Sequence, residues 1–215
     1  MPEPAVSVTS LRAPNNARKE FEKGEEEMHN SHLELATKHL EKAVAEYDKY
    51  AVAWSELGRI YSVRHQIENA RQAFTEAITA DPQYIPPYLG LASLELQVGQ
   101  YESALQSAGK ALELRPGLVF ANFIQGVANF KLNRLEAAEK SARDAESGLH
   151  QNIPQVHLLL ADIFLQKQDY SNATEQMRAY LKEAPQGEFA GETKQRLEQI
   201  EKSAAEIRGT PVRSK

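Results

Sequence analysis

The residues most capable of metal chemistry lie near the N-terminal end of the sequence. His29 and His32 are three positions apart, and Glu25 and His39 lie close to them along the chain. Imidazole and carboxylate groups bind zinc and related metals when they converge on one point. We expect His29 to end one helix and His32 to lie in the following turn, so their side chains need not converge. The sequence therefore predicts surface histidines here and no metal site.

The other polar residues show no pattern that is typical of catalysis. The chain has 215 residues and no cysteine, which excludes disulfides, thiolate metal sites and cysteine nucleophiles. It has no glycine-rich phosphate loop and no serine in the setting of a nucleophile elbow. Glu25-Glu26-Glu27 is a charge run typical of a solvated helix face, and no pair of carboxylates stands out as acid and base. We predict that the protein is not an enzyme and binds no cofactor.

Composition and charge narrow the class of partner. The chain is 41% hydrophobic and 26% charged, with a formal net charge of −5, which is ordinary for a globular protein. Nucleic-acid binding needs a clustered basic surface, so we expect no nucleic-acid partner. No run of ~18 apolar residues occurs, so no membrane insertion is expected. The start of the chain lacks the features of a signal peptide. We expect a cytoplasmic protein by default, or a periplasmic or secreted one if the sequence is a mature or trimmed fragment.

The strongest pattern in the sequence is a spacing that recurs every 34 residues. Its most complete copy combines bulky, small and helix-ending residues: Trp54, Leu57, Gly58, Tyr61, Ala70, Phe74, Ala77 and Pro82. The following copy is Tyr88, Leu91, Ala92, Ala104, Ala108, Ala111 and Pro116. Small residues let two helix axes approach closely, bulky ones fill the space around the contact, and proline ends the second helix. A period of this length indicates stacked helix pairs, because one pair alone cannot bury its apolar face.

These residues and their spacing resemble the tetratricopeptide repeat family over residues 17–187. The resemblance implies an all-α fold, a right-handed superhelical solenoid of antiparallel helix pairs. The frame divides the chain into five repeats: 17–50, 51–84, 85–118, 119–153 and 154–187. Residues 188–208 resemble the capping helix of the family, and we expect residues 209–215 to form a flexible tail. Residues 1–16 contain three prolines and a short alternating piece, and we expect them to be extended or disordered.

In this family the first helices of the repeats line a concave groove, which usually holds a peptide or a partner helix. Helical geometry places eight apolar side chains of the third to fifth repeats on this groove: Leu89, Leu96, Phe120, Phe123, Val127, Phe130, Leu158 and Leu165. If each leaves ~50 Å² exposed, the patch reaches ~400 Å², a size at which an apolar surface suggests a partner. Three alternatives stay open. Curvature can bury these side chains between neighbouring first helices, the chain's own Val6, Val8 and Leu11 can fill the groove, or a dimer can cover it.

The fourth repeat departs from the family where large apolar residues are expected. It carries Asn122, Gln125 and Asn129, whose offsets of three and four put them on one helix face. A buried amide without a partner costs about 1–3 kcal/mol. Either the helix stack accommodates the three amides, as a satisfied ladder or on a slightly rotated helix, or they offer a hydrogen-bonding strip to an extended peptide.

One subclass of the family grips a C-terminal carboxylate with lysine, asparagine and arginine on three successive first helices. The positions that match this clamp from the second repeat onward hold other residues: Ser55, Arg59, Gly90, Phe120 and Ile124. The sequence therefore does not predict an adaptor of that type.

The sequence predicts a protein-interaction scaffold or adaptor that binds a peptide or a helix through the apolar groove. The identity of the protein or peptide partner is left open. The alternative is a structural spacer or an oligomerisation module of a larger protein, for example an exported one, and the strand-like piece near the N-terminus motivates it. A homodimer is compatible with both.

Overall fold

The computed structural model describes the backbone of residues 7–148 and 153–209, with side chains as far as residue 203. All regular structure in these ranges is helical, beginning with the short 3-10 helix η1 (Ser10–Arg12). The α-helices follow in chain order: α1 (Asn15–His29), α2 (Leu33–Glu46), α3 (Ala51–Val63), α4 (Ile67–Ala80), α5 (Pro86–Gln97), α6 (Tyr101–Leu114), α7 (Val119–Lys131), α8 (Leu135–Glu146), α9 (Gln155–Gln166), α10 (Tyr170–Glu183) and α11 (Ala190–Gly209).

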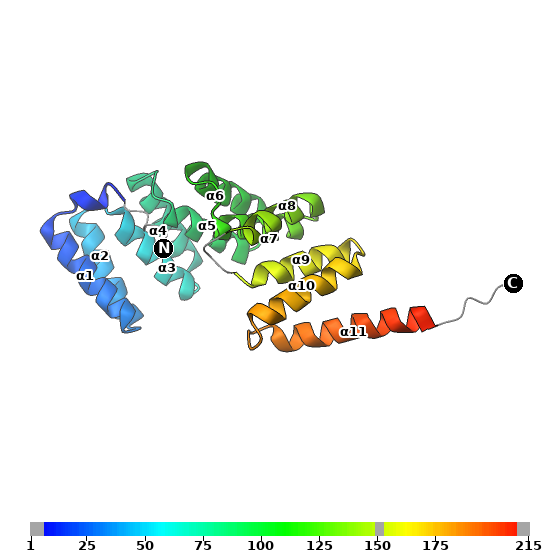
Figure 1. Ribbon diagram of the computed structural model, residues 1–215. Coiled ribbons are helices and arrows are strands. Elements are labelled where there is room, and N and C mark those ends of the chain that lie inside the picture. The colour runs from blue at the N-terminus through cyan, green and yellow to red at the C-terminus, as the bar shows by residue number, and fades with distance from the viewer. Residues whose placement is uncertain (1–6, 149–152, 210–215) are drawn as a thin grey trace.

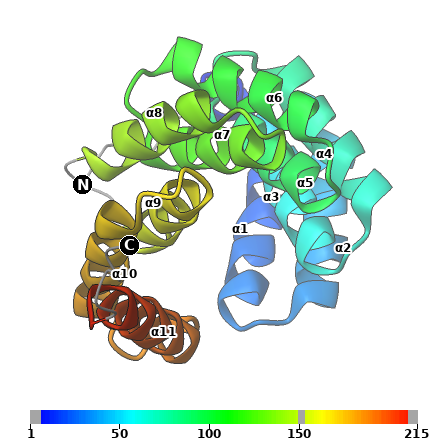
Figure 2. The same cartoon turned by 90° about the vertical axis from the view of Figure 1, so that its right-hand side faces the viewer.

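The helices stack as antiparallel pairs along the chain (Figure 1). Each odd-numbered helix from α1 to α9 packs most closely against the even-numbered helix that follows it, and α11 packs on α10. The pairs follow one another around an arc, with α3, α5, α7 and α9 in sequence along its inner side (Figure 2). The predicted all-α solenoid of antiparallel helix pairs is confirmed.

Small residues at the contact between the two helices of a pair explain the close packing. The alanine at the fourth position of each second helix is fully buried in all five pairs: Ala36, Ala70, Ala104, Ala138 and Ala173. On the facing first helices, a Cβ added to Gly24 would lie 2.9 Å from the Leu40 side chain, and one added to Gly58 would lie 2.6 Å from Phe74. The backbones can therefore approach only because these positions carry no larger side chain.

The turn inside each pair uses one residue in the left-handed backbone region. These residues recur at the repeat spacing, with φ between 56° and 77°: Ser31, His65, Gly99, Asn133 and Gln168. In the second pair the His65 amide donates to the carbonyl of Ser62 at 3.0 Å, and the Gln66 amide donates to that of Tyr61 at 2.9 Å. The same two bonds recur in the other four turns and satisfy the last carbonyls of the first helix.

The N-terminal segment differs from the extended or disordered state expected for residues 1–16. In its described part Ser10–Arg12 forms a 3-10 helix, and α1 begins at Asn15. Ser7 is 1% exposed, and its hydroxyl donates to Asp81 Oδ2 at 2.6 Å, which ties this segment to the end of α4. Val8 and Leu11 point into solvent, 59% and 70% exposed, and so do not fill the groove.

The remaining predicted boundaries can be compared with the helices directly. Each of the five predicted repeats contains one helix pair, apart from the first two residues of α1, which precede the first frame. The expected capping helix over 188–208 corresponds to α11. Val6, residues 149–152 of the fourth frame and residues 210–215 of the expected tail lie outside the described residues.

Candidate functional site

The eight apolar side chains predicted to line the groove come from the first helices of three successive pairs. α5 carries Leu89 and Leu96, α9 carries Leu158 and Leu165, and α7 carries the other four. All eight are half-buried, so each packs partly against the core and leaves part of its surface accessible. The structure distributes six of them between two separate cavities and does not form one continuous strip.

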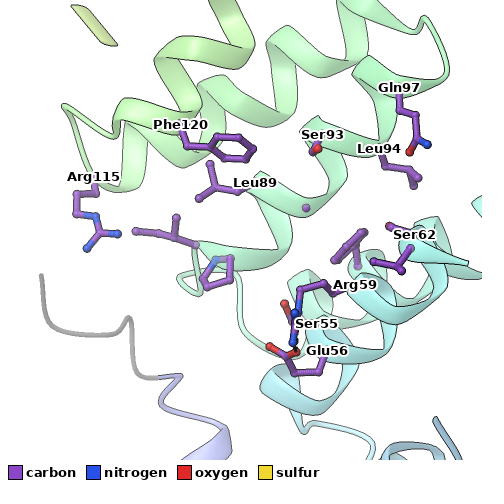
Figure 3. A pocket seen from close by; sticks show the side chains of 15 residues that line it. Ser55, Glu56, Arg59, Ser62, Leu89, Ser93, Leu94, Gln97, Arg115 and Phe120 are labelled. Carbon is purple, nitrogen blue, oxygen red and sulfur yellow. Dashed lines mark hydrogen bonds and ion pairs between the residues drawn. The ribbon is translucent and has the colours of Figure 1, made fainter. Parts of the chain in front are cut away.

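The first cavity has a volume of about 510 Å³ and lies between α3, α5 and α7 (Figure 3). Leu89 and Phe120 line it from the predicted set. The residues that α3 contributes are mostly small or charged: Ser55, Glu56, Arg59, Ser62 and Val63. A volume of ~300–1,000 Å³ is typical of sites that take a small ligand or a few side chains.

The floor of the first cavity is the ring of Phe74, which reaches it from α4. A Cβ on Gly58 would lie 2.6 Å from Phe74 Cδ1, and a Cβ on Gly90 would lie closer still to the same ring. The ring is therefore held between two glycines on neighbouring first helices, and it is only 3% exposed. Gly90 does not follow the repeat spacing, and its contact with Phe74 is the structural reason for a glycine there.

Three charged residues line the first cavity. Arg59 donates to Glu56 Oε2 through Nε at 2.8 Å, so these two charges pair on α3. Arg115 follows α6 directly and reaches the cavity from the link to α7 (Figure 3). Its Nε is buried without a hydrogen-bond partner among the described residues. The repeat pattern predicted no role for Arg115, because this residue falls in a turn and outside the groove positions of the repeat.

The second cavity has a volume of about 380 Å³ and lies between α7, α9 and α11. Four of the eight predicted groove residues line this cavity: Phe123, Val127, Phe130 and Leu158. Phe189, which directly precedes α11, closes one side together with Thr193 and Arg196 of α11, and Arg196 donates to Asp162 on α9 at 2.5 Å. The capping helix thus takes part in lining the C-terminal end of the groove.

Leu96 and Leu165 line neither cavity. Leu96 packs against the apolar cluster that α5, α6 and α7 share, and Leu165 packs against the cluster around α8 and α9. Both remain half-buried, so they support the walls of the groove.

The amides of the fourth repeat lie on another face of α7. Asn122 and Asn129 are 7% and 9% exposed. Gln125 faces α6, where its Nε2 lies 3.7 Å from a Cβ built on Gly109. Two repeats earlier, the equivalent positions hold residues that line a depression between α2 and α4: Trp54, Leu57 and Tyr61. The three amides therefore belong to the side of α7 that packs on the second helices, and none lines the two cavities of the groove.

Comparison with known proteins agrees with this architecture. The family model described as tetratricopeptide repeat matches residues 21–85, 89–152 and 139–188, which together make up most of the chain. The chain belongs to the tetratricopeptide repeat family. Among curated proteins, the chain is 32% identical over 89 residues to the protein CTR9 homolog of Arabidopsis thaliana. This match covers 41% of the present chain and only 8% of the length of that protein.

Solved structures show the same tetratricopeptide repeat fold at low sequence identity. MamA (residues 41 to the end) from Desulfovibrio magneticus RS-1 gives a TM-score of 0.72 at 16% identity, covering 81% of this chain and 98% of that chain. PilF of Pseudomonas aeruginosa gives 0.73 at 18% identity, covering 85% and 83%. YrrB, described as a TPR protein with an unusual peptide-binding site, gives 0.67 at 18% identity, covering 87% and 98%.

The third tetratricopeptide repeat contains a buried acid that the sequence analysis missed. Glu95 is 5% exposed, and Ser107 on α6 donates to its Oε2 at 2.7 Å. Burial raises the pKa of the Glu95 carboxyl, against the opposing effects of that hydrogen bond and of Arg71, whose Nη1 lies 3.7 Å from Oε1. Glu95 stands one repeat after Tyr61, and the fifth repeat has Phe164 at this position, so an acid where two other repeats hold an aromatic residue was the available signal.

The histidines near the N-terminus lie apart in separate contacts. His32 Nδ1 lies 2.8 Å from Glu27 Oε2, and His39 Nδ1 lies 2.8 Å from Glu20 Oε2. Hydrogen bonds from Lys23 and His39 lower the pKa of Glu20 to about 2. Over the part of the chain that the structure describes, no cluster of three metal-ligating residues forms, and no helix is long and apolar enough to cross a membrane.

Proposed function

We propose that this tetratricopeptide repeat protein is an interaction scaffold whose groove binds a peptide or helix of a protein partner. One observation carries the proposal: two cavities follow one another along the inner first helices, and half-buried apolar side chains line both. The description of YrrB as a peptide-binding member of the same fold supports this use of the surface. The proposed contact residues are those predicted from the sequence: Leu89, Leu96, Phe120, Phe123, Val127, Phe130, Leu158 and Leu165.

The size of the apolar surface sets the expected affinity. Covering ~400 Å² at about 25 cal/mol per Å² contributes on the order of 10 kcal/mol before costs. Loss of translational, rotational and side-chain freedom offsets much of this, so an interaction of roughly micromolar strength is expected.

The amide strip formed by Asn122, Gln125 and Asn129 is not part of the proposed groove. Two of the three amides are buried, and the third packs against α6. Among the described residues none of their polar atoms is both fully buried and without a hydrogen-bond partner. We therefore assign the strip to the helix stack, as the first of the two alternatives has it.

Selection of random displayed peptides against the full chain tests the proposal. Peptides selected by the wild-type protein are expected to lose binding to the Phe123→Ser/Phe130→Ser variant, which removes two aromatic rings from the second cavity. A matched control, Leu35→Ser/Tyr170→Ser, removes exposed apolar groups from the second helices α2 and α10, where these side chains are 44% and 55% exposed. Binding that survives the groove variant but not the control variant would contradict the proposal.

The alternative of a spacer or oligomerisation module has one observation in its favour. Val8 and Leu11 of the docked N-terminal segment expose 59% and 70% of their surface, and a second copy of the chain could cover them. Light scattering of residues 1–215 and 17–215 distinguishes the two functions. Self-association that depends on concentration, together with failure to select any peptide, would favour the module over the groove.

A further inference from the structure

The charge balance of the first cavity identifies the chemistry of its occupant. Its lining contains two arginines and one acid: Arg59, Arg115 and Glu56. Arg59 and Glu56 neutralise each other through a contact of 2.5 Å on α3. Arg115 forms no ion pair with any described residue, so the cavity carries one uncompensated positive charge.

The position of Arg115 makes this charge unusual. Its Nε is buried and lacks a hydrogen-bond acceptor within the described part of the chain, although a guanidinium group stays charged in proteins. A buried donor without a partner loses the hydrogen bonds of water and gains none in return. Asp81, one repeat earlier, is satisfied by the Ser7 hydroxyl and by the amide of Gln83 at 3.1 Å. The equivalent position thus has internal partners in one repeat and lacks them in the next.

The surroundings of Arg115 are apolar on the side of the cavity. Ile85, Leu89 and Phe120 line the cavity together with Arg115 (Figure 3). In such surroundings water screens an ion pair less than at an open surface, so an anion gains more from pairing with the arginine. Arginine is also suited to carboxylates, because its planar donors match the two carboxylate oxygens.

We propose that the first cavity binds a peptide segment in which the side-chain carboxylate of an aspartate or glutamate pairs with Arg115, while a neighbouring large apolar side chain covers Leu89 and Phe120. The proposal rests on the groove function proposed above and names the partner's chemistry. The second cavity, between α7, α9 and α11, follows the first along the inner helices, so a segment long enough to contact both cavities would carry the acid within its length. We therefore assign the acid to a side chain within the segment, rather than to its C-terminal carboxylate.

The test is a selection of random displayed peptides against the full chain, with parallel selection against Arg115→Gln. The wild type is expected to enrich peptides that carry aspartate or glutamate beside a large apolar residue, and Arg115→Gln is expected to lose the preference for the acid. A synthetic peptide from the wild-type selection should bind ~10- to 100-fold more weakly after its acid is replaced by the amide, since hydrogen bonds to charged groups are of this strength. Arg115→Gln should bind the acid and amide peptides equally.

Two further variants separate loss of charge from loss of structure. Arg115→Lys keeps the charge and should retain a weaker preference for the acid. Arg134→Gln removes an arginine that pairs with Glu102 at 2.6 Å and lines neither cavity, so it should leave the selection unchanged. Circular dichroism of each variant checks that the helices remain folded.

The outcomes separate this proposal from the groove function. Enrichment of apolar peptides without an acid, with equal binding to Arg115→Gln, would overturn the role of Arg115 and leave the groove function standing. Failure to enrich any peptide would contradict both. Selection that succeeds only after residues 1–6 are removed would make that segment the occupant and overturn the proposal of a separate partner.

Discussion

The two halves of the groove are built on the same backbone pattern but present different side chains. Ser55 and Ser62 on α3 stand two repeats before Phe123 and Phe130 on α7. In the N-terminal half, small residues leave a cavity of about 510 Å³ between α3, α5 and α7. In the C-terminal half, aromatic rings and the start of α11 reduce the space to about 380 Å³. The repeat therefore fixes where a groove position lies, and side-chain size at that position decides whether it is a wall or a space.

Charge differs between the halves as well. The second cavity is lined by equal numbers of opposite charges, Lys131 and Arg196 against Asp162 and Glu192, and Arg196 pairs with Asp162. The first cavity has one more arginine than acid, and Arg115 has no ion pair among the described residues. A cavity whose charges balance has less reason to attract a charged ligand than one with a net charge. We therefore expect the C-terminal half to contribute mainly apolar contact and the N-terminal half to contribute specificity.

The largest expected effect comes from changing the glycines that hold Phe74. Gly90→Ala places a Cβ against the ring of Phe74, and the ring has little room to move because it already packs against Gly58, where an added Cβ would lie 2.6 Å from it. Overpacking of this kind costs about 1–3 kcal/mol. At Gly126, in the C-terminal half, the nearest atom is Cδ2 of Leu159 at 2.8 Å, the far end of a flexible side chain. Urea unfolding should therefore show a larger loss in the free energy of unfolding for Gly90→Ala than for Gly126→Ala. Equal losses would show that the two halves do not differ in how tightly these glycines are packed.

An aromatic ring that fills the first cavity should make the N-terminal half of the groove resemble the C-terminal half, where rings already occupy these positions. Ser62→Phe puts a ring where α7 has Phe130, and we expect affinity for peptides selected on the wild type to fall by about tenfold or more, a cost of ~1.4 kcal/mol. Helicity should be unchanged, because Ser62 is half-buried at the edge of the cavity. Fluorescence anisotropy measures the affinity. Val98→Phe, at a position 38% exposed and outside both cavities, serves as the control and should bind normally. Unchanged affinity in Ser62→Phe would show that the first cavity is not used.

A smaller effect is expected from the buried acid beside the N-terminal half. The raised pKa of Glu95 means that the folded protein binds this proton more tightly than the unfolded chain does. The contribution of this proton to the free energy of unfolding is therefore complete at pH values below the ordinary pKa of 4.5. It is lost as pH rises through the pKa of Glu95 in the folded state. Glu95→Gln should remove this part of the pH dependence and raise the thermal midpoint at neutral pH. A midpoint that falls at neutral pH would show that the Arg71 and Ser107 contacts outweigh the cost of burial.

The smallest effect is expected from the ion pair that joins α11 to the groove. The side chains of Arg196 and Asp162 are 36% and 38% exposed, and pairs of this kind contribute about 0–1 kcal/mol. Arg196→Gln should therefore shift the thermal midpoint little, and less at high salt than at low salt. Differential scanning fluorimetry at two salt concentrations measures it. A large loss would mean that α11 depends on this pair to stay on the groove.

Much of the fold could be predicted because close packing of helices requires small residues at regularly spaced positions of the sequence. Gly58, Ala70 and Ala77 recur with their counterparts at one spacing, since any larger side chain there would separate the helices. The inner positions of α5, α7 and α9 followed from the same frame, and all eight predicted side chains are half-buried in the structure.

Other features could not be read from the spacing. Ser31, His65, Asn133 and Gln168 adopt the left-handed conformation at the turns, although none is glycine, because the helix-ending hydrogen bonds offset the local strain. The contact of Ser7 with Asp81 joins residues that are 74 positions apart. The position of α11 beside the second cavity, and the burial of Arg115 Nε beside the first, likewise depend on how distant elements meet.

The most direct test of the binding surface is the map of backbone amide chemical shifts during titration with a peptide selected on the wild type. We predict shifts that concentrate on the first helices α3, α5, α7 and α9, with Arg115 and its neighbours among the most affected. Shifts confined to the second helices α2, α4, α6 and α8, with the inner helices unaffected, would contradict it.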